Sequence, residues 1–580
     1  MNEFEFYLTD SLEKVFPDKR PAAMEKNTVI SILRGEKAAL QLVCGKVKSG
    51  PKCRMELFYE IKGSPVKARV RNVEPVPSAF PCYEKNDDNY LTTMPGLFPD
   101  LLKPKRDNKI VPLMGQYRSL WIDFPDTQTG AAGVYPVEIV ILARTSGTEK
   151  GALGETGNAA PEEKVVERLS FFLEIVDVPQ PEQTLIHTEW FHCDCLANYY
   201  HTEIFDDRHF KAIESQMMYA GRELGVNMIL TPVFTPPLDT AVGGERRTVQ
   251  LVDISLRGNQ YAFRFEKLRR WCELCKKCGI LYLEIPHLFT QWGALATPKI
   301  VAEVNGAREK IFGWHVPAQS PTYKEFLEQF LPALCRELEK QGFDREHVYF
   351  HISDEPTAEN WESYEKAKSM TAKLLEGRNV IDALSDFLFY EKGLVEHPVV
   401  ANDHIGQFIS QGVGDLWVYY CCGQCHKVPN RFFAMPSARN RIMGVLMYLY
   451  RIKGFLHWGY NFYNSQFSKE AVDPFFDTHA GYAFPSGDPF LVYPGTDGET
   501  WSSVRGEVQR EGLSDLQALY ALEKAVGRER TEEIIYEGED GPFTFTHYPT
   551  HKEYFFRLRR RIADELKTLC GLDGSKSGTL

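Results

Sequence analysis

The hydrophobic and polar positions of residues 1–183 follow the two-residue period of β-strands. Short alternating or apolar runs recur between turn residues without intervening helical patterns; they include TVISILRG, AALQLVCGKV, CRMELFYEIKG, YRSLWIDF, VYPVEIVILAR and LSFFLEIVDV. Strands at this spacing predict an antiparallel β-sandwich. The stretch 146–164, rich in Gly, Ala and charge, predicts a long exposed hairpin loop, and 176–185 predicts the linker to a second domain.

From residue 184 to residue 580, short apolar runs alternate with amphipathic helical segments. The runs read LIHTEWF, NMILTPVF, ILYLEIPHLF, VYFHISDEP, VIDALSDF, LWVYYC and GFLHWGYNF, and an eighth near PVVAND would close a barrel. This alternation favours a (β/α)8 TIM-like barrel with C-terminal helices. A doubly wound sheet is the alternative, but no glycine-rich phosphate turn follows the first run. Within the barrel, 249–265 predicts an inserted β-hairpin. We therefore expect a multidomain α/β protein.

Charge and composition narrow the classes of function. The chain of 580 residues carries a net charge of −12, and aromatic residues make up 13% of it. A negative surface repels nucleic acid, and no basic stripe with interleaved aromatic residues is present, so nucleic acid is not an expected partner. The aromatic enrichment suits stacking against the apolar faces of sugar rings, although large β-rich cores also use many aromatic residues.

The sequence predicts a cytoplasmic protein without a membrane partner. Its N-terminal residues, MNEFEFYLTDSLEKVF, are acidic and lack the pattern of a signal peptide. No apolar run reaches the length of about 18 residues that predicts a membrane-spanning helix. The 13 cysteines are irregularly spaced, which favours reduced thiols over a disulfide framework. The oligomeric state stays open.

Polar and aromatic residues gather at the predicted carboxyl ends of the barrel strands, where barrel enzymes bind their substrates. Each residue alone is weak evidence, because Trp and His near strand ends are often packed in the core. Their common placement on one rim favours a sugar-binding bowl. In chain order they are Trp190, His192, Asp194, His287, Gln291, Trp292, Trp417, Tyr419, Tyr420, His457, Trp458, Tyr460 and Asn461.

The segment FHISDEP places two adjacent acids, Asp354 and Glu355, at the end of a buried strand. Burying two carboxylates without a partner is costly, so they are expected to face a polar cleft. Adjacent strand residues point to opposite faces, so both can reach one cleft only where the strand is ending, and Pro356 permits that departure. The alternative is that one acid caps the helix that follows. The aromatic rim favours catalysis.

Several separate segments of the barrel resemble glycoside hydrolase family 123, β-N-acetylgalactosaminidases with an N-terminal β-sandwich and a catalytic (β/α)8 barrel. These segments are HLFTQWGA, ISDEP, DLWVYYCC, GFLHWGYNFYN, GDPFLVYPG and WSSVRGEVQREGLSDLQALY. The resemblance implies a retaining, exo-acting enzyme that removes terminal β-linked N-acetylgalactosamine. Its partner would be the glycoside of a 2-acetamido sugar, and it would need no cofactor.

The resemblance also implies substrate-assisted catalysis, in which the acetamido oxygen of the substrate attacks the anomeric carbon and forms an oxazoline-type intermediate. Glu355 would be the general acid and then the base, and Asp354 would accept the acetamido N–H. An ionised carboxylate beside Glu355 would raise its pKa and keep it protonated. Tyr419 is the candidate donor to the acetamido oxygen, with Tyr420 as the alternative. Trp458 is the candidate platform under the sugar ring.

The substrate contacts expected on this basis are His192, His287, Trp292, Trp417, Tyr420, Trp458, Asn461 and Asp488. Three other functions stay open: a β-N-acetylglucosaminidase, another β-glycosidase on the same barrel, or a carbohydrate-binding protein without turnover. The presence of both acids argues against the last.

No metal site is expected. Cys272, Cys275 and Cys278 have helical spacing, which predicts a buried apolar stripe rather than a zinc site. A second cluster would bind a metal or simply line a loop, and we favour the loop; it consists of Cys421, Cys422, Cys425 and His426. Phosphate-binding loops of the GxGxxG and GxxxxGK types are absent.

Overall fold

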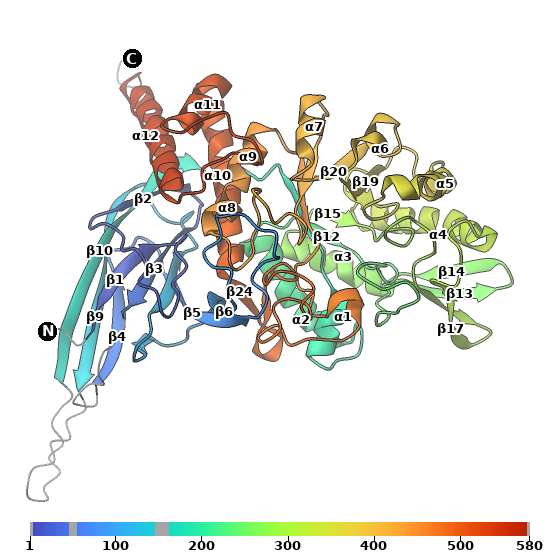
Figure 1. Cartoon of the computed structure of the whole chain (residues 1–580), viewed down its shortest axis with the longest axis horizontal. Helices are drawn as coiled ribbons and strands as arrows, with labels where there is room; N and C mark the ends of the chain where they lie inside the picture. Colours follow the sequence, from blue (N-terminus) through green and yellow to red (C-terminus); the bar gives the residue numbers. More distant parts are fainter. Residues whose placement is uncertain (1–3, 46–54, 146–161, 577–580) are drawn as a thin grey trace, which may run out of the picture.

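The computed structural model describes residues 4–45, 55–145 and 162–576. Figure 1 shows the N-terminal sheets on one side, the barrel with its helices on the other, and the C-terminal helices above their junction. Most of the predicted loop 146–164 lies outside the described residues. The strands that flank it, β9 (Gly133–Thr145) and β10 (Glu162–Pro179), pair as an antiparallel hairpin.

Two sheets form the N-terminal region. The order of the first is β1 (Phe6–Asp10), β3 (Ala38–Cys44), β8 (Arg118–Phe124), β5 (Arg69–Ser78), β6 (Gly96–Pro104), β24 (Thr500–Ser503) and β23 (Tyr493–Pro494). The second runs β2 (Val29–Arg34), β10, β9, β4 (Met55–Lys62) and β7 (Lys109–Ile110). One apolar core joins them, with Leu40 and Ile122 from the first sheet and Ile139 and Leu173 from the second.

The prediction of N-terminal antiparallel sheets is confirmed, with two differences. Strand β2 runs parallel to β10. Strands β23 and β24, which follow the barrel in sequence, extend the first sheet beyond β6. Sequence patterns reveal strands but not their partners, because hydrogen bonding between distant segments leaves no local signal.

Eight parallel strands close into a barrel, as the alternating pattern predicts. They are β11 (Ile186–Glu189), β12 (Met228–Leu230), β15 (Tyr282–Glu284), β18 (Val348–Phe350), β19 (Asn379–Leu384), β20 (His397–Ala401), β21 (Trp417–Tyr419) and β22 (Gly454–His457). Strand β22 pairs with β11 and so completes the ring. Side chains that point inward fill its centre, among them Met228, Leu230, Val399 and Leu456. The barrel is therefore a packed core with one functional face, the carboxyl ends of its strands.

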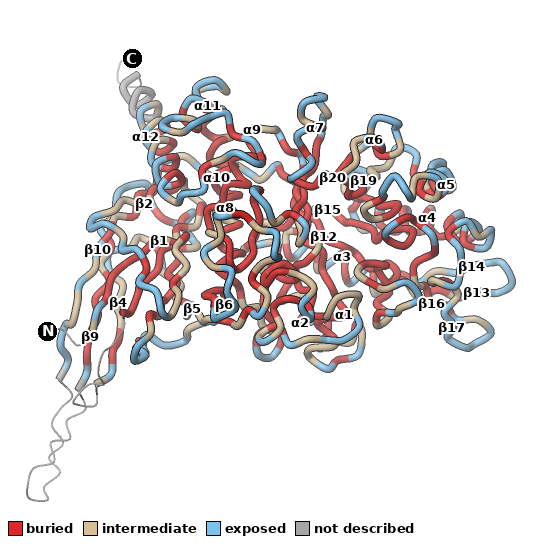
Figure 2. The backbone as a smooth tube through the Cα atoms, in the orientation of Figure 1, coloured by how far each residue is buried: buried red, intermediate tan, exposed pale blue. Residues whose placement is uncertain are grey.

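Helices follow the barrel strands in turn. They are α1 (Cys193–Tyr199), α2 (Asp207–Met218), α3 (Glu266–Cys278), α4 (Pro321–Lys340), α5 (Trp361–Thr371), α6 (Phe387–Glu391), α7 (Ile405–Ser410), α8 (Ser437–Arg441) and α9 (Met443–Leu449). Helix α3 buries Cys272, Cys275 and Cys278 completely, which confirms the apolar stripe. Figure 2 shows that buried backbone runs through the barrel strands, whereas the outer turns of α5, α6 and α7 are exposed.

The predicted hairpin at 249–265 belongs to a four-stranded sheet beside the barrel. Its strands β13 (Asp253–Arg257) and β14 (Gln260–Arg264) are joined by β16 (Ile300–Val304) and β17 (Ala307–Phe312) in the order β14-β13-β16-β17. Helix α4 packs against β14. This small sheet follows from two separate insertions, one before α3 and one before α4.

Three C-terminal helices and a group of buried ion pairs fix the sandwich to the barrel. The helices are α10 (Val504–Val526), α11 (Arg528–Tyr536) and α12 (Glu553–Lys576), and α12 packs against β2 and β10. Arg71 of β5 contacts Asp123 at 2.9 Å and Glu507 of α10 at 2.7 Å. Arg505 of α10 contacts Asp100 of β6 at 2.9 Å. Charges this deeply buried are stable only as pairs, so these contacts hold the two parts in one orientation.

Among the described residues, no helix is both long and apolar enough to cross a membrane.

Candidate active site

A pocket of about 120 Å³ opens at the carboxyl ends of the barrel strands. Its wall takes residues from, or from the loops after, seven of the eight strands; β20 contributes none. The lining residues are Trp190, Leu238, Asp239, Gln291, Trp292, Asp354, Glu355, Ala383, Tyr419, Cys421, Cys422, Leu456, Trp458 and Phe484. This is the position at which barrel enzymes carry their active sites.

A sharp turn after β18 brings Asp354 and Glu355 into the same pocket. Strand β18 ends at Phe350, and Glu355 has a φ of 43°, in the left-handed region. Two backbone hydrogen bonds hold the turn: Trp292 N donates to Asp354 O, and Glu355 N donates to Ala383 O, each at 3.1 Å. Positive φ in a residue with a side chain costs energy, and such residues concentrate at functional sites. The expected departure from strand geometry is therefore present.

Neither acid caps the helix that follows. Helix α5 begins after Asn360, and the short 3₁₀ turn before it begins after Thr357; the backbone N–H groups at these starts receive no side-chain hydrogen bond. Helix capping, the alternative explanation for the two acids, is therefore not supported by the structure.

Burial and mutual repulsion set the protonation of the acid pair. Burial raises the pKa of Asp354, and the charge of Glu355 raises it further. Burial also raises the pKa of Glu355, against the effect of a hydrogen bond from Tyr419. Tyr419 Oη lies 2.5 Å from Glu355 Oε1 and donates to it. Among the described residues, none donates a hydrogen bond to the Asp354 carboxylate, which faces the pocket. The pair can therefore share one proton at a pH above that at which free carboxyls ionise, and keep one acceptor open for a ligand.

Aromatic side chains form most of the remaining wall. Trp458 Nε1 donates to Asp488 Oδ2 at 3.0 Å, and the rings of Trp458 and Phe484 meet edge to face at 5.3 Å. Trp190 Nε1 donates to Glu284 Oε1 at 2.7 Å. Trp292, 41% exposed, stands at the rim with a φ of 57°. Fixed indole rings of this kind offer flat apolar surfaces for the C–H faces of a sugar.

We predict that Trp458→Ala raises KM for a glycoside substrate about tenfold or more, because an aromatic contact contributes about 1 kcal/mol beyond the area that it buries. Trp458→Phe keeps a ring and loses only the hydrogen bond to Asp488, so its KM should rise less. Initial-rate kinetics of the two variants measures the difference. Equal KM values for Trp458→Ala and the wild type would contradict a role of Trp458 in stacking against the sugar.

Three residues predicted to contact substrate lie behind the wall instead. His192 is buried, and its Nε2 lies 2.9 Å from Trp458 O. Asn461 is buried too, and its Oδ1 accepts from His192 N at 2.6 Å. Asp488 is fully buried beneath the indole of Trp458. His192 and Asn461 are hydrogen-bonded to each other, and His192 and Asp488 contact Trp458, so in this structure the three residues support Trp458 and do not line the pocket.

Three other predicted contacts lie farther from the pocket. Trp417 points into the barrel like Tyr419 but sits one layer lower, where it lines a cavity at the opposite end of the barrel together with Glu346. Tyr420 points outward, as the alternation of a strand requires, and packs against Phe455. His287 is fully buried below the pocket. The alternative of Tyr420 in place of Tyr419 is therefore not supported.

Two polar or aromatic lining residues, Asp239 and Phe484, were not named from the sequence, and two others, Trp190 and Gln291, were placed on the rim but given no role in the site. Burial raises the pKa of Asp239 to about 6, and its Oδ2 accepts from Phe467 N at 3.0 Å. Gln291 Oε1 accepts from Asp239 N at 2.6 Å. Trp190 and Gln291 do follow predicted strands, whereas Asp239 and Phe484 lie in long loops that carry no periodic signal. Only the closed fold brings them to the site.

Cys421 and Cys422 line the pocket after β21. The Sγ of Cys421 lies 3.2 Å from Gln424 Oε1, and that of Cys425 lies 3.6 Å from Lys85 O. Among the described residues, the one group of three or more side chains with metal-ligand atoms close together is a different one, and it contains no cysteine. Cys421 and Cys422 thus line the wall as part of the loop after β21.

A closed parallel barrel with adjacent acids in an aromatic pocket is the arrangement of a glycoside hydrolase. The family model of the glycoside hydrolase 123 catalytic domain matches residues 190–522. The chain belongs to glycoside hydrolase family 123, and it is a glycoside hydrolase.

A solved structure shares the fold over nearly the whole chain. A family 123 glycoside hydrolase from Clostridium perfringens, described for glycolipid glycan hydrolysis, is similar at a TM-score of 0.71 and 15% identity, over 99% of this chain and 100% of that chain. A GH2 β-galacturonidase from Eisenbergiella tayi aligns at a TM-score of 0.31 and 8% identity, over 88% of this chain and 97% of its own. A β-glucuronidase from Ruminococcus gnavus aligns at 0.28 and 8%, over 88% and 98%. No curated protein sequence matches the chain.

Proposed function

We propose that this protein is a retaining, exo-acting glycoside hydrolase that removes terminal β-linked N-acetylgalactosamine by substrate-assisted catalysis. The observation that carries the proposal is the acid pair: Asp354 and Glu355 open into one small pocket, and the Asp354 carboxylate has no protein donor among the described residues. A carboxylate without a protein donor in such a site can accept an N–H or O–H group of the ligand. A 2-acetamido group supplies that N–H.

In the proposed reaction, Glu355 protonates the glycosidic oxygen as the bond to the anomeric carbon breaks. The acetamido oxygen attacks the same carbon from the opposite face and forms the oxazoline ring. Asp354 accepts the acetamido N–H and stabilises the positive charge that develops on the ring. Glu355, now ionised, then takes a proton from the water that opens the oxazoline. Two displacements retain the β configuration.

Tyr419 is proposed to orient the nucleophile. Without substrate, its hydroxyl donates to Glu355 at 2.5 Å. A bound acetamido group would offer a second acceptor beside Glu355, and transfer of the hydrogen bond to it would hold the acetamido oxygen toward the anomeric carbon. The same transfer would remove a bond that favours the ionised form of Glu355, and so would help to keep this residue protonated for the acid step.

The pocket supports exo action. Its cavity of about 120 Å³ is bounded on several sides by Trp190, Trp292, Trp458 and Phe484. A space of that size and closure suits one terminal sugar ring better than an internal segment of a chain. Asp239, which shares the pocket, is the candidate partner for a sugar hydroxyl.

A panel of aryl β-glycosides tests the proposal. Rates of aglycone release are compared for N-acetylgalactosamine, N-acetylglucosamine, galactose and glucose with one common aglycone. We expect the first to be hydrolysed fastest, the second more slowly, and the sugars without an acetamido group least. Faster release from N-acetylglucosamine would show that this sugar is the preferred substrate. Fastest release from galactose would exclude the acetamido group as the nucleophile. Release from none of the four would contradict the proposed activity.

The acid pair also predicts the pH dependence. The reaction needs the pair with one proton, so activity falls at low pH when both carboxyls are protonated and at high pH when both are ionised. Burial raises both pKa values, which moves both limits upward from the range of free carboxyls. We therefore expect the maximum of kcat/KM to lie above the usual carboxyl pKa of about 4. A profile of kcat/KM against pH checks this; a maximum at or below that value would contradict it.

A further inference from the structure

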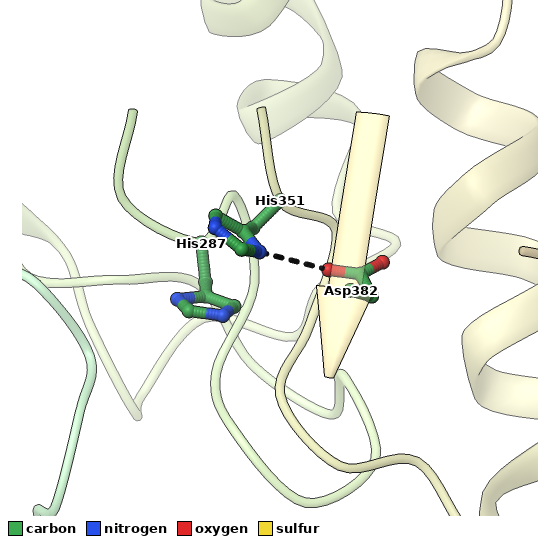
Figure 3. Close-up of side chains that lie close together, drawn as sticks. All are labelled: His287, His351 and Asp382. Atoms are coloured by element: carbon green, nitrogen blue, oxygen red, sulfur yellow. Dashed lines mark ion pairs between the residues drawn. The ribbon is translucent and has the colours of Figure 1, made fainter. Parts of the chain in front are cut away.

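Below the pocket lies a buried cluster of His287, His351 and Asp382, drawn in Figure 3. His351 directly follows β18, three residues before Asp354, and Asp382 lies in β19. The Nδ1 of His351 is 3.4 Å from Asp382 Oδ1, and its Nε2 is 2.7 Å from Glu284 Oε1. All four side chains are fully buried.

The geometry of the two imidazoles argues against a shared metal ion. The potential ligand atoms of His287, His351 and Asp382 lie within 4.8 Å of one another. However, the rings of His287 and His351 are stacked, with centroids 4.3 Å apart and planes inclined by 28° (Figure 3). The lone pairs of an imidazole lie in the ring plane, so stacked rings direct them side by side and not toward one ion at the bond length of about 2 Å.

The cluster is better suited to hold an extra proton on His351 than to bind a metal ion. His351 has a carboxylate near each ring nitrogen: Nε2 is hydrogen-bonded to Glu284, and Nδ1 lies at ion-pair distance from Asp382. Only the imidazolium form carries a proton on both nitrogens. Burial lowers the pKa of His351, but the hydrogen bonds and charges of Asp382 and Glu284 outweigh this effect and raise it to about 9. Burial and the charge of His351 lower the pKa of His287, which leaves a neutral ring stacked on a cation.

The two carboxylates also hold parts of the active site. Glu284 accepts from Trp190 Nε1 at 2.7 Å and from Thr188 Oγ1 at 2.5 Å. Asp382 accepts from Ile352 N at 3.0 Å and from Tyr364 Oη at 2.5 Å. One network thus joins an aromatic wall of the pocket to the backbone two residues before Asp354.

We propose that His351 is a positioning residue: as an imidazolium held between Glu284 and Asp382, it fixes Trp190 and the turn of the acid pair, and its charge favours the ionised form of Asp354 and so the placement of the shared proton on Glu355. The groups that face His351 are Glu284, Asp382 and the neutral His287. On the pocket side, the charge of His351 lowers the pKa of Asp354 against the larger effects of burial and Glu355. The inference rests on the proposed function, because the proton must be on Glu355 for the acid step.

The variant His351→Gln tests whether the charge of His351 acts on Asp354. A neutral amide can keep a hydrogen bond but cannot oppose the rise in the pKa of Asp354, so that pKa should rise. The acidic limb of kcat/KM is then expected to move upward by about one pH unit, which lowers kcat/KM on that limb about tenfold beyond any loss at the pH optimum. His209→Gln, at another fully buried histidine, is the matched control and should leave the limb in place. An unmoved limb in an active, folded His351→Gln variant would overturn the proposal.

A second measurement does not depend on activity. Nitrogen-15 NMR of histidine-labelled wild-type enzyme at pH 7.5 to 8 should show one imidazole with both nitrogens protonated, where an ordinary histidine is neutral. Its loss in His351→Gln assigns the signal. A neutral His351, or one zinc ion per chain in the purified enzyme, would overturn the proposal. If the wild type cleaves no glycoside yet His351 is charged, the proposed function fails and the charged network stands.

Discussion

Glu355→Gln is expected to lower kcat on an aryl glycoside of N-acetylgalactosamine about 10²- to 10⁴-fold, while the sugar still binds. The amide keeps the shape of the side chain but can neither deliver a proton to the glycosidic oxygen nor take one from water. The loss should be smaller for an aglycone that leaves readily without protonation, and this dependence marks Glu355 as the general acid.

Kinetics with two aglycones of different acidity, together with titration calorimetry of N-acetylgalactosamine, measures the effect. Glu346→Gln, at the other end of the barrel, is the matched control and should keep wild-type rates. A rate loss below tenfold with a poor leaving group, or a loss of sugar binding equal to the loss of rate, would contradict the role.

The same variant has a predictable effect on stability. Burial raises the pKa of Glu355 above its usual 4.5, so this residue favours folding most below pH 4.5 and loses that contribution as the pH rises through its folded-state pKa. Gln carries no charge at any pH. We therefore expect Glu355→Gln to melt no lower than the wild type at neutral pH, and a much lower melting temperature would mean that Glu355 has a structural role.

Asp354→Asn is expected to lower kcat on the same substrate about 10²- to 10³-fold, comparable to the loss of a group that stabilises charge in the transition state. Asn cannot balance the positive charge of the oxazoline, and its NH₂ group opposes the acetamido N–H. The effect should be confined to 2-acetamido sugars. Asp415→Asn, at the far end of the barrel, is the matched control. An unchanged rate in Asp354→Asn would exclude the oxazoline route.

Much of the fold was predictable because its determinants are local. Each barrel strand is a short apolar run bounded by turn residues, and each long helix has an amphipathic period, so chain order alone predicts a barrel. The parallel pairing of β2 with β10 and the addition of β23 and β24 to the N-terminal sheet were not predictable. They depend on contacts between segments far apart in sequence.

The site was predictable where strands end and unpredictable where loops fold back. Asp354, Glu355, Tyr419, Trp292 and Trp458 all line the pocket, as their positions at strand ends indicated.

The predicted residues that lie away from the pocket have a common feature. A strand end does not reveal the layer or the face of a residue, so Trp417 falls one layer too low and Tyr420 on the outer face. Polar residues such as His192, Asn461 and Asp488 can equally serve the back of a wall, where buried groups need partners. Asp239 and Phe484 reach the pocket from loops, without any signal in the periodicity.

The most direct test of the central claim varies the nucleophile within the substrate. Aryl β-glycosides of galactosamine are compared that carry acetamido, monofluoroacetamido, difluoroacetamido and trifluoroacetamido groups. Fluorine withdraws electrons from the carbonyl oxygen but changes the size of the group little. Substrate-assisted catalysis predicts that kcat/KM falls steeply and steadily with each fluorine. Equal values of kcat/KM across the series would show that the acetamido oxygen does not attack, and would contradict the account.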